Sequence, residues 1–222
     1  MRDFAEIETI AAKRKGGMKA LSTFLSEPLA PKKLARRPLS AWLEAMAKAI
    51  FQAGFNWRVI ENKWPGFQAA FEGFDPATIG FWDDEHIERL LADARIVRNG
   101  GKIEAVRQNA RFLMSLQSET GDAARHLALW PVEDQKGLID LLATRGARLG
   151  GITGQRVCRM VGRDAYIITP DVLKRLALEG IVDGPPTARA AIARVQDAFN
   201  RWHRESGRPM TQISQILAMS VD

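Results

Sequence analysis

Residues 149–175 read LGGITGQRVCRMVGRDAYIITPDVLKR, and we interpret the rest of the chain outward from them. Three of its first six residues are glycines, which adopt positive φ without strain and let the backbone approach a partner closely. We therefore expect a tight turn over residues 149–154. Gly154 is expected to open a second helix, which covers residues 155–161. The pattern predicts two short helices joined by a glycine turn.

The start of this second helix has the features of an anion-binding site. The first N–H groups of a helix have no intrahelical partner and carry the positive end of the helix dipole. Such N–H groups commonly bind a phosphate. The arginines near the turn are Arg145, Arg148, Arg156 and Arg159. The predicted phosphate-binding residues are Gly150, Gly151, Ile152, Thr153, Gly154 and Arg156. The alternative is a structural corner whose glycines serve packing alone.

The composition indicates a globular protein with an acidic partner. A chain of 222 residues suits one domain, or one domain with an added arm, and 46% hydrophobic residues exclude a wholly disordered chain. The formal net charge of +6 favours nucleic acid as the partner. An all-helical protein whose basic face binds an acidic protein is the alternative from another class.

Cofactors, disulfides and membrane segments are not expected. The single cysteine, Cys158, excludes an intrachain disulfide and provides no cluster of zinc ligands, and we expect its thiol to be buried. No apolar run is long enough to cross a bilayer, and the charged N-terminus lacks a cleavable hydrophobic segment. We therefore expect a monomeric cytoplasmic protein without a metal ion or a cofactor.

Apolar residues recur at helical spacing along most of the chain, which predicts an all-α fold. The only strand-like piece, YIIT at residues 166–169, is too short to build a sheet. Residues 1–38 are expected to form a basic N-terminal arm that ends in an extended, proline-rich connector over residues 28–38. A compact helical domain is expected over residues 39–222, with the glycine turn and its two helices at 145–175.

Beyond these patterns, residues 52–113 resemble the DNA-3-methyladenine glycosylase I family. The shared words stand in the family's order: QAGFNW at 52–57, FQAAF at 67–71, FDP at 74–76, DARIVR at 93–98, KIEA at 102–105 and NAR at 109–111. The glycine turn is similar to the helix–hairpin–helix with which DNA glycosylases grip the DNA backbone. The resemblance implies a base-excision repair hydrolase that cuts the N-glycosidic bond of alkylated bases, 3-methyladenine above all, flipped out of double-stranded DNA.

The resemblance also implies a pocket for the flipped base. Such a base is held by stacking and by hydrogen bonds to its edge. Trp57 falls at the aromatic position that lines the family's pocket, and Gln52, Phe55 and Asn56 accompany it. The alternatives are that Trp57 is a core tryptophan and that Gln52 and Asn56 cap local backbone.

The chain departs from the family where the chemistry is expected. The family carries a glutamate three residues before the glutamine of QAG, and Ala49 stands there in this sequence. Glu44 would lie on a different face of the same helix. The family's zinc site also has no counterpart, because the chain offers only Cys158 and three scattered histidines, His86, His126 and His203.

A catalytic aspartate is usual after the second hairpin helix in the wider superfamily. The alignment places Thr169 at that point and Asp171 two residues later. Asp171 is therefore a candidate catalytic residue, and the alternative is that it caps a helix beginning at Val172. Three functions stay open: a divergent 3-methyladenine glycosylase, a glycosylase of altered base specificity that uses Asp171, and a DNA-lesion binding protein without catalysis.

Overall fold

A computed structural model describes residues 1–222, and every regular element in it is a helix, as the sequence predicted. The chain divides into two compact units. Unit 1 comprises residues 1–29, 131–137 and 162–222, and unit 2 comprises residues 30–130 and 138–161. None of the helices has both the length and the apolar character needed to cross a membrane.

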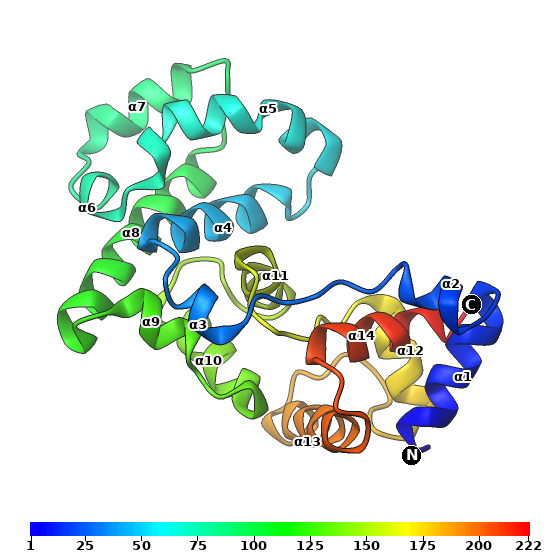
Figure 1. The fold of residues 1–222 in the computed structure, drawn as a ribbon. Coiled ribbons are helices and arrows are strands. Elements are labelled where there is room, and N and C mark those ends of the chain that lie inside the picture. The colour runs from blue at the N-terminus through cyan, green and yellow to red at the C-terminus, as the bar shows by residue number, and fades with distance from the viewer. The chain divides into compact units, whose positions relative to one another are not determined.

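Unit 2 contains most of the residues that carry the family words. Its elements are α3 (Pro31–Leu34), α4 (Leu39–Gln52), α5 (Trp57–Ala70), η1 (Glu72–Phe74), α6 (Pro76–Ile79), α7 (Asp84–Ala92), α8 (Gly100–Thr120), α9 (Ala123–Ala128), the larger part of α10 (Gln135–Arg145) and α11 (Ile152–Val161). Helix α4 packs against both α8 and α11 (Figure 1). It therefore forms the centre of the unit.

Helix α4 is central because most of its residues are apolar and buried, so that the helix packs against neighbours on several sides. Trp42, Leu43, Met46 and Phe51 are fully buried. Phe51 meets Phe67 edge to face, with ring centroids 4.6 Å apart, and this contact ties α4 to α5. Each buried aromatic side chain of this kind stabilises a fold by roughly 1.5–3 kcal/mol. The position of the α4–α5 turn is thus fixed by the core.

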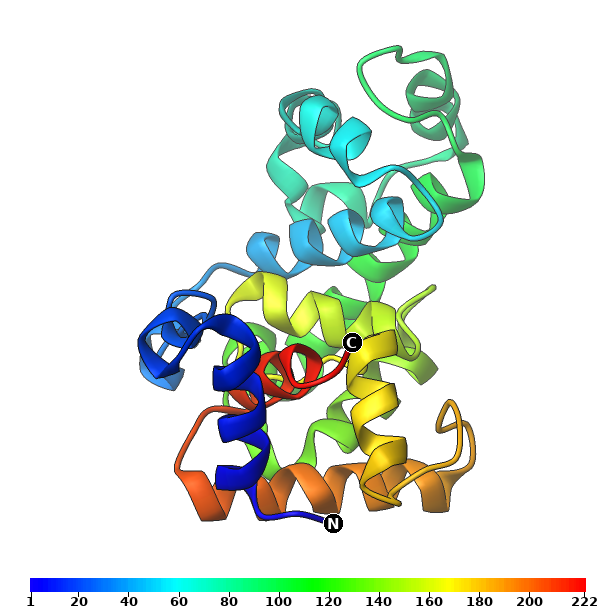
Figure 2. The same ribbon diagram turned by 90° about the vertical axis from the view of Figure 1, so that its right-hand side faces the viewer.

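Unit 1 is built around its last helix. Its elements are α1 (Phe4–Lys15), α2 (Met18–Ser22), η2 (Val132–Asp134), α12 (Pro170–Leu178), α13 (Arg189–Ser206) and α14 (Met210–Met219). Helix α14 contacts α1, α12 and α13, and Figure 2 shows α13 running across the end of α1. Asp164 holds the start of α14, because its carboxylate accepts hydrogen bonds from the N–H groups of Met210 and Thr211 at 3.1 and 2.8 Å.

The proline-rich connector is not extended throughout. Pro31 begins a single helical turn, α3, and Leu34 at its end is buried. Proline is compatible with the first helical position because its missing N–H would have no partner there. The connector is therefore a packed element of unit 2 from residue 30 onward.

An ion pair fixes the end of α10, immediately before the glycine turn. The guanidinium of Arg145 donates to both carboxylate oxygens of Glu119 on α8, and it lies over the ring of Phe112. Arg145 and the hydroxyl of Ser115 lower the pKa of Glu119 from its ordinary 4.5 to about 2.

This ion pair predicts a specific pH dependence of stability. Because folding lowers the pKa of Glu119, its stabilisation is complete above about pH 4.5 and is lost as the pH falls toward about 2. We expect Glu119→Gln to be less stable than the wild type at pH 7, and the difference to shrink below pH 4.5. Urea unfolding of both proteins across this range measures it. A difference that is constant with pH would contradict the prediction.

Candidate functional site

The glycine turn is present, but its second helix begins earlier than expected. Helix α11 starts at Ile152, and the N–H of Gln155 donates to the carbonyl of Gly151. Gly154 is therefore a buried residue of the first helical turn rather than the residue that opens the helix. A Cβ there would lie 2.5 Å from the carbonyl oxygen of Leu149. Packing explains this glycine, as the structural alternative proposed.

Gly151 instead lies in the exposed part of the turn. Its φ is +55°, and a Cβ added there would meet nothing within 4 Å. Arg148 also has a positive φ, +59°, which is uncommon outside glycine. Asn109 on α8 secures this backbone: its side chain accepts from the N–H of Ala147 at 2.8 Å and donates to the carbonyl of Ala147 at 3.1 Å. The turn is held from inside and open to solvent at Gly151.

Two aromatic side chains are exposed where α4 ends and α5 begins. The exposed fractions are 43% for Phe55 and 46% for Trp57, so Trp57 is not a core residue. Trp57 is the first residue of α5. The carbonyl oxygen of the Asn56 side chain caps that helix by accepting from the N–H of Arg58 at 3.0 Å. The cap therefore fixes the place of the indole.

Gln52, the last residue of α4, is almost completely buried. Its amide nitrogen donates to Glu61 at 2.8 Å, and Glu61 also pairs with Lys48. The amide oxygen of Gln52 has no hydrogen-bond partner. A buried acceptor without a partner costs about 1–3 kcal/mol, so a donor that reached this oxygen would form a favourable hydrogen bond.

Lys102, which sequence reasoning missed as a site residue, holds the α4–α5 turn. Its ammonium donates to the carbonyls of Phe51 and Ala53 at 3.1 and 2.7 Å, and lies 5.1 Å from the ring of Phe55. Burial lowers the pKa of Lys102, and the positive charge of Arg148 lowers it further. The only signal in the sequence was its place in the word KIEA.

The structure brings the two predicted sites of unit 2 together. Arg156, predicted to bind phosphate, lies on α11, and its guanidinium carbon is 4.6 Å from the centre of the Trp57 ring. We call the exposed rings of Phe55 and Trp57 the aromatic platform, and Arg156 lies over its Trp57 ring. Three cationic side chains, those of Lys102, Arg148 and Arg156, thus lie on or next to the platform and the glycine turn.

The structure places no carboxylate at the position of the family's glutamate, and it shows Glu44 and Asp171 in other surroundings. Ala49 is fully buried within α4, and Glu44 accepts hydrogen bonds from Trp64 and Gln68. Asp171 belongs to unit 1, where it is exposed in the first turn of α12.

The prediction that Asp171 caps its helix is wrong. Thr169 caps it, because its hydroxyl accepts from the N–H of Val172 and Pro170 occupies the first helical position. The structure does not bring Asp171 into one unit with the aromatic platform.

A zinc ion of the kind that the family resemblance implies does not fit this chain. No three histidine, cysteine, aspartate or glutamate side chains are grouped so that they could hold a metal ion. Cys158 is buried in α11, as expected.

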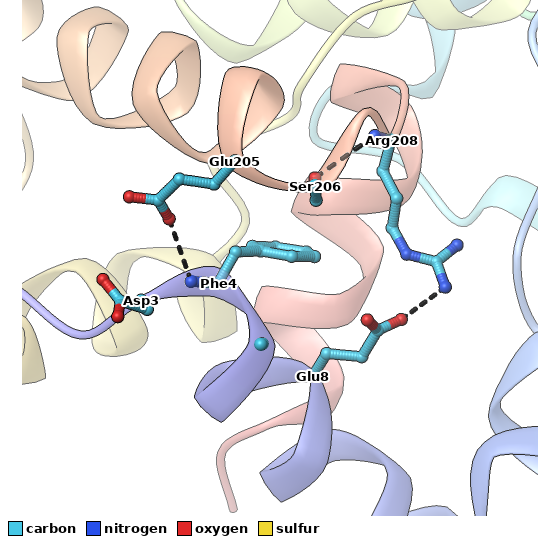
Figure 3. A pocket seen from close by; sticks show the side chains of 7 residues that line it. Asp3, Phe4, Glu8, Glu205, Ser206 and Arg208 are labelled. Carbon is cyan, nitrogen blue, oxygen red and sulfur yellow. Dashed lines mark hydrogen bonds and ion pairs between the residues drawn. The ribbon is translucent and has the colours of Figure 1, made fainter.

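Unit 1 contains a separate cavity of about 630 Å³, drawn in Figure 3. It is lined by Asp3, Phe4, Ala5, Glu8, Glu205, Ser206 and Arg208. Its carboxylates are engaged within the unit: Asp3 pairs with Arg201, Glu8 with Arg208, and Glu205 accepts from the N–H of Phe4 at 3.0 Å. An excess of carboxylates over arginines makes this cavity a poor site for phosphate.

Comparison with known proteins shows what a part of the chain is similar to. The family model described as methyladenine glycosylase matches residues 39–145. The DNA-3-methyladenine glycosylase 1 of Escherichia coli (strain K12) is 38% identical over 66 residues, which is 30% of this chain and 35% of that protein. The chain therefore matches about a third of the length of this curated relative.

Two solved structures resemble the fold. A variant of 3-methyladenine DNA glycosylase I in complex with 3-methyladenine covers 64% of this chain and 84% of its own, at 20% identity and a TM-score of 0.53. The enzyme from Staphylococcus aureus covers 68% of this chain and 89% of its own, at 20% identity and a TM-score of 0.52. The fold resembles that of 3-methyladenine DNA glycosylase I. The match to the methyladenine glycosylase family model covers just under half of the chain.

The open turn at Gly151 generates a test of its role. Gly151→Asp would place a carboxylate at the predicted phosphate site and strain a residue of positive φ. We expect duplex affinity to fall by roughly tenfold and the salt dependence of the remaining binding to become shallower. Gly121→Asp is the matched control, because Gly121 also has positive φ and open space but lies at the end of α8. Equal losses in both variants would remove the turn from the DNA-binding site.

Proposed function

We propose that the chain is a base-excision DNA glycosylase that hydrolyses the N-glycosidic bond of alkylated bases, with 3-methyladenine as the first candidate. The observation that carries this proposal is the contact between Trp57 and Arg156. It places an exposed stacking surface beside the helix that follows the glycine turn, within one unit. A glycosylase needs both features close together, because the nucleotide that it flips stays attached to the DNA backbone.

Double-stranded DNA is the proposed partner, and the turn is the proposed grip on its backbone. Gly151 is open to solvent, and the first N–H groups of α11 belong to the same turn. Arg148 adds a positive charge at this point without an ion-pair partner. Phosphate contacts of this kind position a protein on DNA without reading its sequence. Unit 2 would thus bind a DNA duplex irrespective of its sequence and could act on a damaged base at any position.

The flipped base would be held mainly by stacking. Base–aromatic stacking contributes about 1–3 kcal/mol per base. N3-alkylated adenine in DNA is cationic, so the face of an indole favours it over unmodified adenine. The unpaired amide oxygen of Gln52 is an acceptor close to the α4–α5 turn, where a hydrogen bond to the base edge would satisfy it.

Bond cleavage is proposed to depend on the leaving group. A cationic alkylated base leaves as a neutral molecule, so the protein needs to supply less acid catalysis than it would for an unmodified base. Ala49 supplies no carboxylate, and Glu44 is engaged elsewhere in unit 2. This chemistry restricts the proposed substrates to bases that are already activated by alkylation.

Base release from methylated duplex DNA tests the proposal. Purified protein is incubated with the DNA, and the liberated bases are separated and identified. We expect release of 3-methyladenine, and Trp57→Ala should lower the rate at least about tenfold because the stacking surface is lost. Phe81→Ala is the control, since Phe81 is 86% exposed in the same unit but lies after α6.

Two other outcomes would contradict the proposal in different ways. Release of a different base would assign altered specificity and make Asp171→Asn the next variant. Duplex binding without release of any base would identify a lesion-binding protein instead.

A further inference from the structure

We propose that Arg156 occupies the face of Trp57 on which the flipped base stacks, and that the base enters when the guanidinium moves to a DNA phosphate. Arg156 would then be a positioning residue that closes the aromatic platform in the absence of DNA. This inference rests on the proposed function, because it concerns the same stacking surface.

The guanidinium of Arg156 is free to move. Its carbon lies 4.6 Å from the centre of the Trp57 ring, and the side chain makes no hydrogen bond or ion pair. Two other arginines of unit 2, by contrast, pair with carboxylates: Arg145 with Glu119 and Arg107 with Glu104. Arg156 is thus held over the indole by the ring alone.

The contact also shows what kind of group the Trp57 face accepts. The face of an indole ring carries negative partial charge and attracts a flat cation. A guanidinium is planar and cationic, as is an N-alkylated purine in DNA, so the two compete for one surface. Arg156 therefore occupies the platform with the same chemistry that the proposed substrate would use.

An exchange of partners is favourable once DNA is bound. A cation–π contact at a half-exposed ring is weaker than a charge-assisted, bidentate contact between arginine and phosphate. Arg156 lies on α11, five residues after Gly151, so its side chain starts from the helix that follows the turn proposed to hold the backbone. Movement of the guanidinium toward a phosphate would uncover the indole when a flipped nucleotide needs it.

Lys102 and Arg148 favour the same exchange. Both side chains are cationic, so neither can form an ion pair with Arg156. Arg148 itself has no ion-pair partner. An anion that approaches the turn would therefore meet three positive charges at once. Phosphate binding and the uncovering of Trp57 are coupled in this arrangement. The protein therefore keeps its stacking surface covered when no DNA is bound.

Binding of free 3-methyladenine in the absence of DNA tests this inference. NMR follows the indole N–H signal of Trp57, which is identified as the signal missing from Trp57→Phe. We expect Arg156→Gln to bind the base about twofold to fivefold more tightly than the wild type, because the competing cation is gone. The control Arg89→Gln removes an equal charge from the exposed surface of α7 and should leave the affinity unchanged.

A second measurement uses a duplex with an abasic site, which offers phosphates but no base to stack. The side-chain protons of Arg156 lie over the ring and should have signals displaced by its ring current. We expect these signals to move to ordinary positions when the duplex binds. Arg156→Gln should also bind this duplex more weakly, with the slope of log affinity against log salt reduced by about one.

The outcomes separate this inference from the proposed function. If base release occurs but Arg156→Gln binds the free base no better than the wild type, the competition is refuted and the glycosylase proposal stands. If the Arg156 signals stay displaced in the duplex complex, the exchange is refuted in the same way. If neither protein binds or releases any base, the proposed function fails, and the inference fails with it.

Discussion

The packing of α4 against α8 and α11 is the constraint on which the candidate site depends. Helix α4 ends at Gln52, so its buried position determines where the turn that carries Phe55 and Trp57 emerges. Helix α11 follows the glycine turn, so the same packing places Arg156. Neither position follows from local sequence alone, because both depend on packing against α4. One buried helix therefore sets the distance between a stacking surface and a proposed backbone grip.

Positive charge is concentrated at this point and is stabilised by backbone rather than by carboxylates. Lys102 donates to two carbonyls at the end of α4, where a helix has unpaired acceptors and a negative dipole end. The two carbonyls satisfy the hydrogen bonding of the ammonium, but no carboxylate neutralises its positive charge. Arg148 and Arg156 add two further charges without ion pairs. A folded chain tolerates such a cluster where an anion is part of its working state.

The sequence was sufficient for the fold class and for the similarity to methyladenine glycosylases, because helical periodicity and ordered words are local signals. It also indicated Trp57, whose exposure confirms that it is not a core residue. The start of α11 was predicted three residues late, because the hydrogen bond from Gln155 to Gly151 extends the helix into the turn. The contact between Arg156 and Trp57 could not be predicted, because it depends on how α11 packs against α4.

Ala49, which stands where the glutamate is expected from the family resemblance, is completely buried in the core. Its neighbours on α4, Ile50 and Phe51, are equally buried. A glutamate at this buried position would need a partner for its carboxylate, because an unpaired buried charge costs several kcal/mol. Under the proposed function, catalysis would rely on the charge of the substrate and on stacking. We therefore expect selectivity to depend on Trp57 and on Arg156, the cation that covers it.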